Sequence, residues 1–210
     1  MRYPQGHKGR KGVAVMTAIL FLFTSCSLGR QGTLDPGGLP GEGSFVVSVP
    51  RPADGRDVAF TMSTLVNNST TDEITFTSID LVGGNGLELV DVFTVDDDHQ
   101  IPVGMPVPPQ ADDGNGDPAS GLDPVANWET RTPLIHSVVP PEQQLRLVIV
   151  LQPTSSDDCL SVRGYSITYR EHGRSYAVTS NAGMVVFNGD SDDGQCDDVE
   201  DEILNNPIAK

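Results

Sequence analysis

The chain has 210 residues, of which 29 are Asp or Glu and only 13 are Lys or Arg, so its formal net charge at pH 7 is −16. A surface of this sign repels nucleic acid, which argues against a DNA- or RNA-binding role. The length fits one folded domain.

The first residues have the order of an export signal. Residues 1–12 contain four basic side chains and no acidic one, and an apolar run follows at residues 13–23. A helix needs about 20 residues to cross a bilayer, so this shorter run does not predict a permanent transmembrane helix. Removing residues 1–25 would leave nine basic residues against 29 acidic ones, a net charge of about −20.

The apolar run ends in Phe23-Thr24-Ser25-Cys26, which resembles the lipobox of bacterial lipoproteins, although Phe23 stands where Leu is usual. The resemblance implies cleavage before Cys26, a lipid on its sulfur and a place on the outer face of the membrane. The alternative is an ordinary cleaved signal, which would leave a secreted chain with an incidental cysteine. Residues 26–43 are rich in Gly and Pro and are predicted to form a flexible tether.

Cys159 and Cys196 remain as a pair once Cys26 carries lipid. In an oxidising compartment a disulfide is the default state of such a pair. Two aspartates adjoin each cysteine, whereas a reactive thiolate needs positive surroundings. We therefore predict a structural disulfide.

From residue 44 onward the apolar residues recur with a period of two, which predicts β-strands. Residues 145–152, "LRLVIVLQ", are apolar on both faces and predict a strand near the centre of the fold. Residues 74–81 change phase, which predicts a β-bulge near Thr77. A second apolar ladder is predicted from Val58, Phe60, Met62 and Val66.

The remaining segments complete a predicted two-sheet sandwich of seven or eight strands. "EHGR" predicts a hairpin turn in which Gly173 takes a positive φ. The segment "DDVEDEILNN" in the acidic tail, residues 197–210, is the one helix candidate, and it is too short to be stable without docking. The polar stretch 110–127 is predicted as a surface excursion. Further strands are predicted at residues 45–49, 87–95, 132–139, 162–169, 175–179 and 184–187.

The segment "TLVNNSTTDEITFTSIDLVGGNGLELV", followed by a Cys, "VRGYSITY" and a second Cys, resembles the immunoglobulin-like β-sandwich domains of exported bacterial lipoproteins of unknown function. The resemblance covers most of residues 44–196. It implies an all-β, antiparallel sandwich and an extracytoplasmic location, and it brings no catalytic residues with it.

Calcium is the most specific ligand that the sequence suggests. Asp113, Asn115 and Asp117 alternate, which is how calcium loops direct oxygen ligands at one ion. Pro118 and Pro124 depart from the EF-hand pattern, where Gly and Glu are required. Flexible acidic loops are the alternative explanation, and a second acidic loop has similar spacing at Asn188, Asp190 and Asp192.

Other chemistries find little support. A copper motif seen in similar small sandwiches would need Met eleven residues after His99, but Gln110 stands there. The histidines form no ligand pair: we interpret His136 as a polar strand residue and His172 as a turn residue. No hydrolase motif is present.

The sequence therefore predicts a non-enzymatic, membrane-anchored binding module for a protein or cell-envelope partner, with residues 96–127 as the first place to look for its site. One alternative is a lipoprotein that binds a small ligand or calcium and delivers it to an envelope transporter. An envelope enzyme is a third, since catalytic residues can come together from distant loops without a local motif. The sequence predicts neither the partner nor the oligomeric state.

Overall fold

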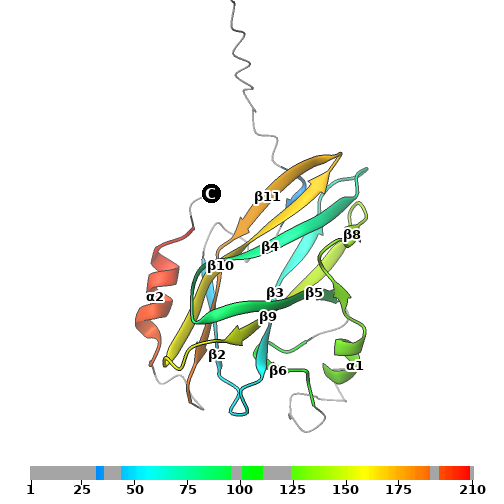
Figure 1. The fold of residues 1–210 in the computed structure, drawn as a ribbon. Coiled ribbons are helices and arrows are strands. Elements are labelled where there is room, and N and C mark those ends of the chain that lie inside the picture. Colours follow the sequence, from blue (N-terminus) through cyan, green and yellow to red (C-terminus); the bar gives the residue numbers. More distant parts are fainter. Residues whose placement is uncertain (1–31, 36–43, 96–100, 111–123, 190–193, 209–210) are drawn as a thin grey trace, which may run out of the picture. The chain divides into compact units, whose positions relative to one another are not determined.

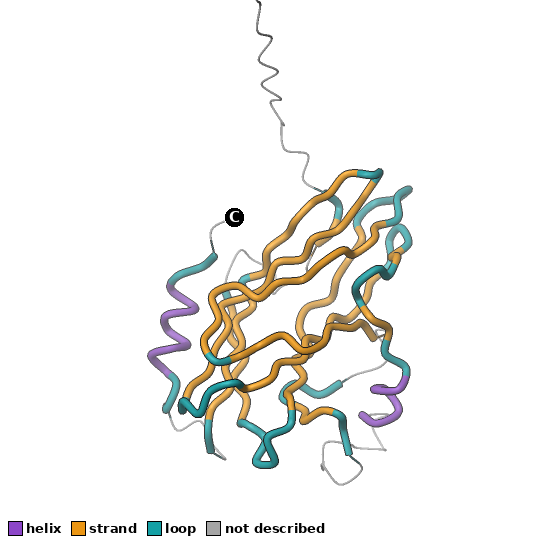
Figure 2. Tube along the Cα trace, viewed as in Figure 1, coloured by secondary structure: helices purple, strands orange, loops and turns teal. Residues whose placement is uncertain are grey.

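A computed structural model of the chain describes residues 32–35, 44–95, 101–110, 124–189 and 194–208. Two six-stranded sheets pack against each other in this part of the chain (Figures 1 and 2). The predicted all-β sandwich is confirmed. Among the described residues, no helix combines the length and the apolar character needed to span a membrane.

The first sheet contains six strands, which are β1 (Leu34–Asp35), β3 (Asp57–Asn67), β5 (Leu87–Val95), β6 (Met105–Val107), β7 (Thr132–Pro133) and β9 (Gln144–Pro153). Their order is β1-β3-β9-β5-β7, and β6 pairs with β3. Strand β9 therefore lies at the centre, as its apolar residues on both faces predict.

The second sheet contains β2 (Phe45–Pro50), β4 (Ile74–Asn85), β8 (Val138–Val139), β10 (Cys159–Glu171), β11 (Arg174–Ser180) and β12 (Ala182–Phe187). Its order is β2-β12-β10-β4-β8, and β11 pairs with β10. Strands β2 and β12 are parallel, so this sheet is mixed, whereas a purely antiparallel fold was expected. Of the twelve strands in the described residues, four have only two or three residues, and the eight longer ones match the predicted number.

The main core lies between the sheets. On β9, Leu147, Ile149 and Leu151 face this core, while Val148 and Val150 belong to a cluster on the opposite face. The period of two in the sequence predicts this division, because successive side chains of a strand point to opposite faces.

Two bulges shift the registers of β3 and β4. The one in β4 falls at Thr77, as predicted. The one in β3 falls between Thr61 and Thr64, and it corrects the predicted ladder: Leu65 is buried in the core, while Val66 is only half-buried. An extra residue in a strand reverses which side chains face inward, so the alternation could not continue to Val66.

The predicted strand over residues 132–139 is wrong. Its ends are β7 and β8, which belong to different sheets, and the residues between them cross from one sheet to the other. Leu134 N donates to Val92 O of β5 at 3.1 Å, and His136 N donates to Phe76 O of β4 at 2.9 Å. His136 has a φ of 70° and is exposed, so it is a turn residue and not a polar strand residue.

Both sheets carry an outer layer. On the first sheet, Trp128 of α1 (Pro124–Glu129) packs edge-on against Phe93 with ring centroids 5.0 Å apart. Residues 110–127 are predicted as a surface excursion, yet their last four residues begin this helix. On the second sheet, α2 (Asp197–Asn205) buries Ile203 against Val185. The predicted helix therefore has the docking that its short length requires.

Candidate functional site

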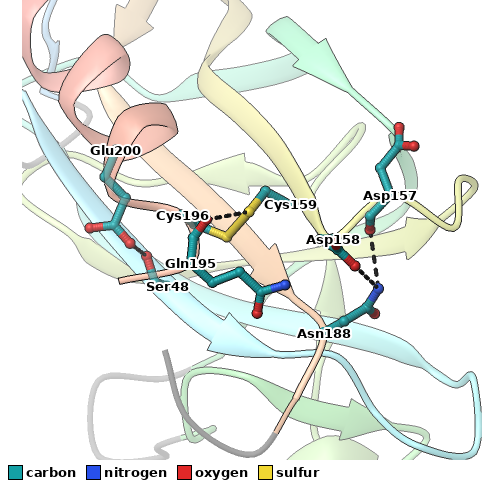
Figure 3. Close-up of a disulfide and its surroundings, with 8 residues drawn as sticks. All are labelled: Ser48, Asp157, Asp158, Cys159, Asn188, Gln195, Cys196 and Glu200. Carbon is teal, nitrogen blue, oxygen red and sulfur yellow. Dashed lines mark hydrogen bonds between the residues drawn. A yellow bond between two sulfur atoms is a disulfide. The ribbon is translucent and has the colours of Figure 1, made fainter. Parts of the chain in front are cut away.

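The disulfide between Cys159 and Cys196 is formed as predicted, with the two Cα atoms 5.8 Å apart (Figure 3). It joins the first residue of β10 to the residue preceding α2. Nearby, Ser48 of β2 donates a hydrogen bond to Glu200 of α2. The bridge thus fastens the helix to the second sheet at the point where the helix begins.

Several predicted site residues lie outside the described residues, namely Cys26, His99, Asp113, Asn115, Asp117, Asp190 and Asp192. Of the second acidic loop, Asn188 is described, and its side chain donates to the carbonyl of Asp157 at 3.3 Å and to Asp158 Oδ1 at 3.4 Å (Figure 3). Within the described ranges, no three His, Cys, Asp or Glu side chains are placed to hold a metal ion.

A polar depression of about 440 Å³ adjoins the β10–β11 hairpin, and we call it the hairpin pocket. The turn residues His172 and Gly173 have φ values of 50° and 71°, which confirms the predicted tight turn. His172 Nε2 lies 2.6 Å from Asp72 Oδ2. The pocket is lined by Thr71, Asp72, Glu73, Thr75, Arg170, His172 and Gly173.

Asp72 is the centre of the hydrogen bonding in this pocket. Besides His172, the hydroxyls of Ser69 and Thr71 donate to its Oδ2 at 3.2 and 3.0 Å. Ser69 and His172 thus both bond to the carboxylate. In a Ser–His–Asp triad the serine bonds to the histidine instead, so the described geometry favours a structural role for these three residues.

The hydrogen bonds to Asp72 should make the stability of the fold depend on pH. Desolvation raises the pKa of Asp72, but hydrogen bonds from Thr71, His172 and Ser69 together outweigh it and hold the pKa below 3.8. A carboxyl group with a lowered folded-state pKa stabilises the fold above its unfolded-state pKa, and this contribution is lost as the pH falls through the folded-state pKa.

We therefore expect Asp72→Asn to be less stable than the natural chain at pH 7, with a difference that shrinks below about pH 4. Urea unfolding between pH 2.5 and pH 7 measures it. Asp80→Asn, a change at an exposed aspartate of β4, is the control. A difference for Asp72→Asn that stays constant over this range would contradict the prediction.

A second depression, of about 380 Å³, lies between β4 and β5, and we call it the side groove. The two strands join at the Asn85–Leu87 corner and separate from there, and the crossing segment between β7 and β8 lies at the other end (Figure 1). Val90 is 51% exposed and Asp91 is exposed, so the groove is open to solvent. Its lining is Thr77, Ser78, Ile79, Leu89, Val90, Asp91, Val92, Pro133 and Ile135.

The strand edges along the side groove are only partly paired. The crossing segment pairs with β4 at Ile74, Thr75 and Phe76, and with β5 from Val92 onward. Beyond these positions, no residue that the structure describes pairs with the outer edge of β4 or β5. The open length of β4 begins at the bulge residue Thr77.

No protein-family model matches the chain, and no curated protein sequence matches it. The sequence directs attention to residues 96–127, but in that range Ile101, Met105 and Val107 are buried on the outer face of the first sheet. The side groove was missed because it depends on where the predicted strand 132–139 breaks. The one local sign of the side groove is that buried and exposed residues cease to alternate at Val90 and Asp91 of β5, which are adjacent and both exposed.

Proposed function

We propose that this protein is a non-enzymatic, membrane-anchored extracytoplasmic lipoprotein whose β-sandwich is a binding module. The observation that carries the proposal is the Cys159–Cys196 disulfide, since such bridges persist in oxidising compartments outside the cytoplasm. The leader-like residues 1–25 and the lipobox-like segment ending at Cys26 support the same location.

The way in which the tether joins the sandwich supports anchoring close to the membrane. Strand β1 lies inside the range predicted as tether, yet it pairs with β3, and Leu34 N donates to Tyr169 Oη at 3.3 Å. Gly32 fits so tightly that a Cβ there would lie 1.9 Å from Tyr169 Oη. Only five residues separate Cys26 from Gly32, so the end of the sandwich that holds β1 would lie within about 20 Å of the lipid.

The side groove favours binding of a macromolecular partner over carriage of a small ligand. Pockets for small ligands usually enclose 70–90% of the ligand surface. Three of the residues that line the side groove, Val90, Asp91 and Pro133, are exposed, so a ligand there would remain open to water. A binding site of this form suits a chain segment laid along it.

The anchor is tested by Cys26→Ser in cells that export the protein. We expect the natural chain in the membrane fraction, with a mass that shows cleavage before Cys26 and attached acyl chains. The variant should move almost entirely to the soluble fraction or keep its leader. Asn68→Ala serves as the control, because Asn68 is exposed and its replacement leaves both the lipid site and the disulfide intact. A natural chain found in the cytoplasm, or in the medium without lipid, would overturn the proposed anchor.

A further inference from the structure

We propose that the side groove binds an extended, positively charged segment of a partner protein, which adds as a strand to the open edge of β4. This inference rests on the proposed binding role, and it does not depend on the lipid anchor. Strand addition satisfies the main-chain groups of an exposed edge and selects a sequence through the side chains beside it.

Part of the exposed edges of β4 and β5 is already paired with the crossing segment of the same chain. Residues of the crossing segment pair with β4 at Ile74 and Thr75, and His136 N donates to Phe76 O at 2.9 Å. From Phe76 this segment crosses to β5, where Leu134 N donates to Val92 O at 3.1 Å. The added strand would continue along β4 from the point where this pairing stops, over residues 77–82.

The open edge carries few of the features that usually prevent pairing. Natural proteins protect exposed edges with lysines, prolines or bulges. The lysines of this chain are at positions 8, 11 and 210, and residues 74–92 contain no proline. The bulge at Thr77 lies where the internal pairing ends, and the bulge at Val90 lies on β5. The edge of β4 from Ser78 to Val82 is therefore regular and available, and it ends at Gly83, whose φ is 62°.

The groove offers apolar contacts to alternate side chains of an added strand. Ile79 and Val92 form its buried part, Leu89 and Ile135 are half-buried, and Val90 is 51% exposed. In an extended peptide every second side chain points the same way. Apolar residues at those positions would cover Val90 and Ile135, and the other positions would face the outer side of the sheet.

The acidic residues around the side groove favour a positively charged partner. Asp91 lines the groove, and the exposed residues Asp80 and Glu88 flank it on β4 and β5, while the lining contains no basic residue. Arg163 of the neighbouring strand β10 lies against Gly83, beyond the end of the open edge, and its guanidinium donates to the carbonyl of Asn206. A cationic segment would be attracted, whereas a second copy of this chain would bring the same acids to the edge and be repelled.

The test uses the full chain, expressed with its own leader in exporting cells so that the disulfide forms. Its probes are three short synthetic peptides: alternating lysine and valine, alternating glutamate and valine, and the lysine peptide interrupted by prolines. Calorimetry measures affinity, and amide hydrogen exchange shows where each peptide binds. The charge-reversed variant is Asp80→Lys with Glu88→Lys, and its matched control is Asp201→Lys with Glu202→Lys on α2.

We expect the lysine–valine peptide to bind and to slow exchange of the amides in residues 77–82. The glutamate and proline peptides should bind at least about tenfold more weakly, a difference of about 1.4 kcal/mol. The groove variant should lose about tenfold in affinity and the α2 variant less than about twofold. For the natural chain, affinity should also fall as salt rises.

Three results would overturn the inference: equal binding by the proline-interrupted peptide, unchanged affinity in the groove variant, or no binding by the lysine–valine peptide. Protection found only at another surface would overturn the groove assignment while leaving a binding role for the sandwich. The fractionation of Cys26→Ser decides the anchor separately.

Discussion

Replacing Cys159 and Cys196 together with alanine is expected to lower the free energy of unfolding by about 3 to 4 kcal/mol. The bridge closes a separation of 37 residues, and a cross-link of that span removes conformational freedom chiefly from the unfolded chain. The loop that it closes contains three strands, β10, β11 and β12, so its loss affects the central part of the second sheet.

Urea denaturation of the natural chain and the double variant measures this loss. Hydrogen exchange should also speed up in α2, because the helix starts directly after Cys196 and buries one side chain, Ile203, against the sheet. Adding a reductant to the natural chain should produce the same change, and reductant should leave the variant unaffected. A double variant within about 1 kcal/mol of the natural chain would contradict the prediction.

The second sheet shows what the sequence pattern predicts well. From Tyr165 onward strand β10 alternates buried and more exposed residues, and Tyr165, Ile167 and Tyr169 all lie in the core. The phase change in β4 predicts its bulge at Thr77, because alternation is a property of neighbouring residues in one strand. The parallel pairing of β2 with β12 joins residues more than 130 positions apart, and no local pattern specifies it.

The crossing segment shows why the side groove could not be predicted. Residues 132–139 have the composition of a strand, but their path is decided by hydrogen bonds to Val92 on one sheet and Phe76 on the other. Those partners become neighbours only after both sheets have formed. The outer layer also depends on distant residues: Ile101, Met105 and Val107 are buried together with Val148 and Val150 of β9, which are far from them in the sequence.

The disulfide, unlike the side groove, could be predicted from the sequence, because few pairings are open to three cysteines. Cys159 and Cys196 can be paired from their number and the expected compartment, and the structure forms that bridge. Cys26 and the predicted calcium ligands lie outside the described residues, so for them the prediction remains as the sequence makes it.

Asn67→Ala is expected to lower the free energy of unfolding by about 2 to 4 kcal/mol, because it leaves buried polar groups without partners. The side chain is fully buried at the end of β3. Its Nδ2 donates to the carbonyls of Asp72, Val139 and Pro140 at 2.8, 3.1 and 3.0 Å. Its Oδ1 accepts hydrogen bonds from Ser69 N at 3.0 Å and from the hydroxyl of Thr33 at 3.2 Å.

These partners come from the N-terminal segment, the β3–β4 loop and the end of β8, so a single amide joins three parts of the chain where the tether enters the sandwich. Asn67→Asp keeps the shape but places a carboxylate against three carbonyl oxygens. It should therefore be less stable than Asn67→Ala at pH 7 and recover partly in acid, where the carboxyl is neutral.

Urea unfolding of both variants at pH 7 and pH 4 provides the measurement. Asn68→Ala is the matched control, since Asn68 is exposed and bonds to Thr33 through its main chain; it should change stability by less than about 0.5 kcal/mol. If Asn67→Asp were as stable as the natural chain at pH 7, the amide would not be the donor that holds these carbonyls together.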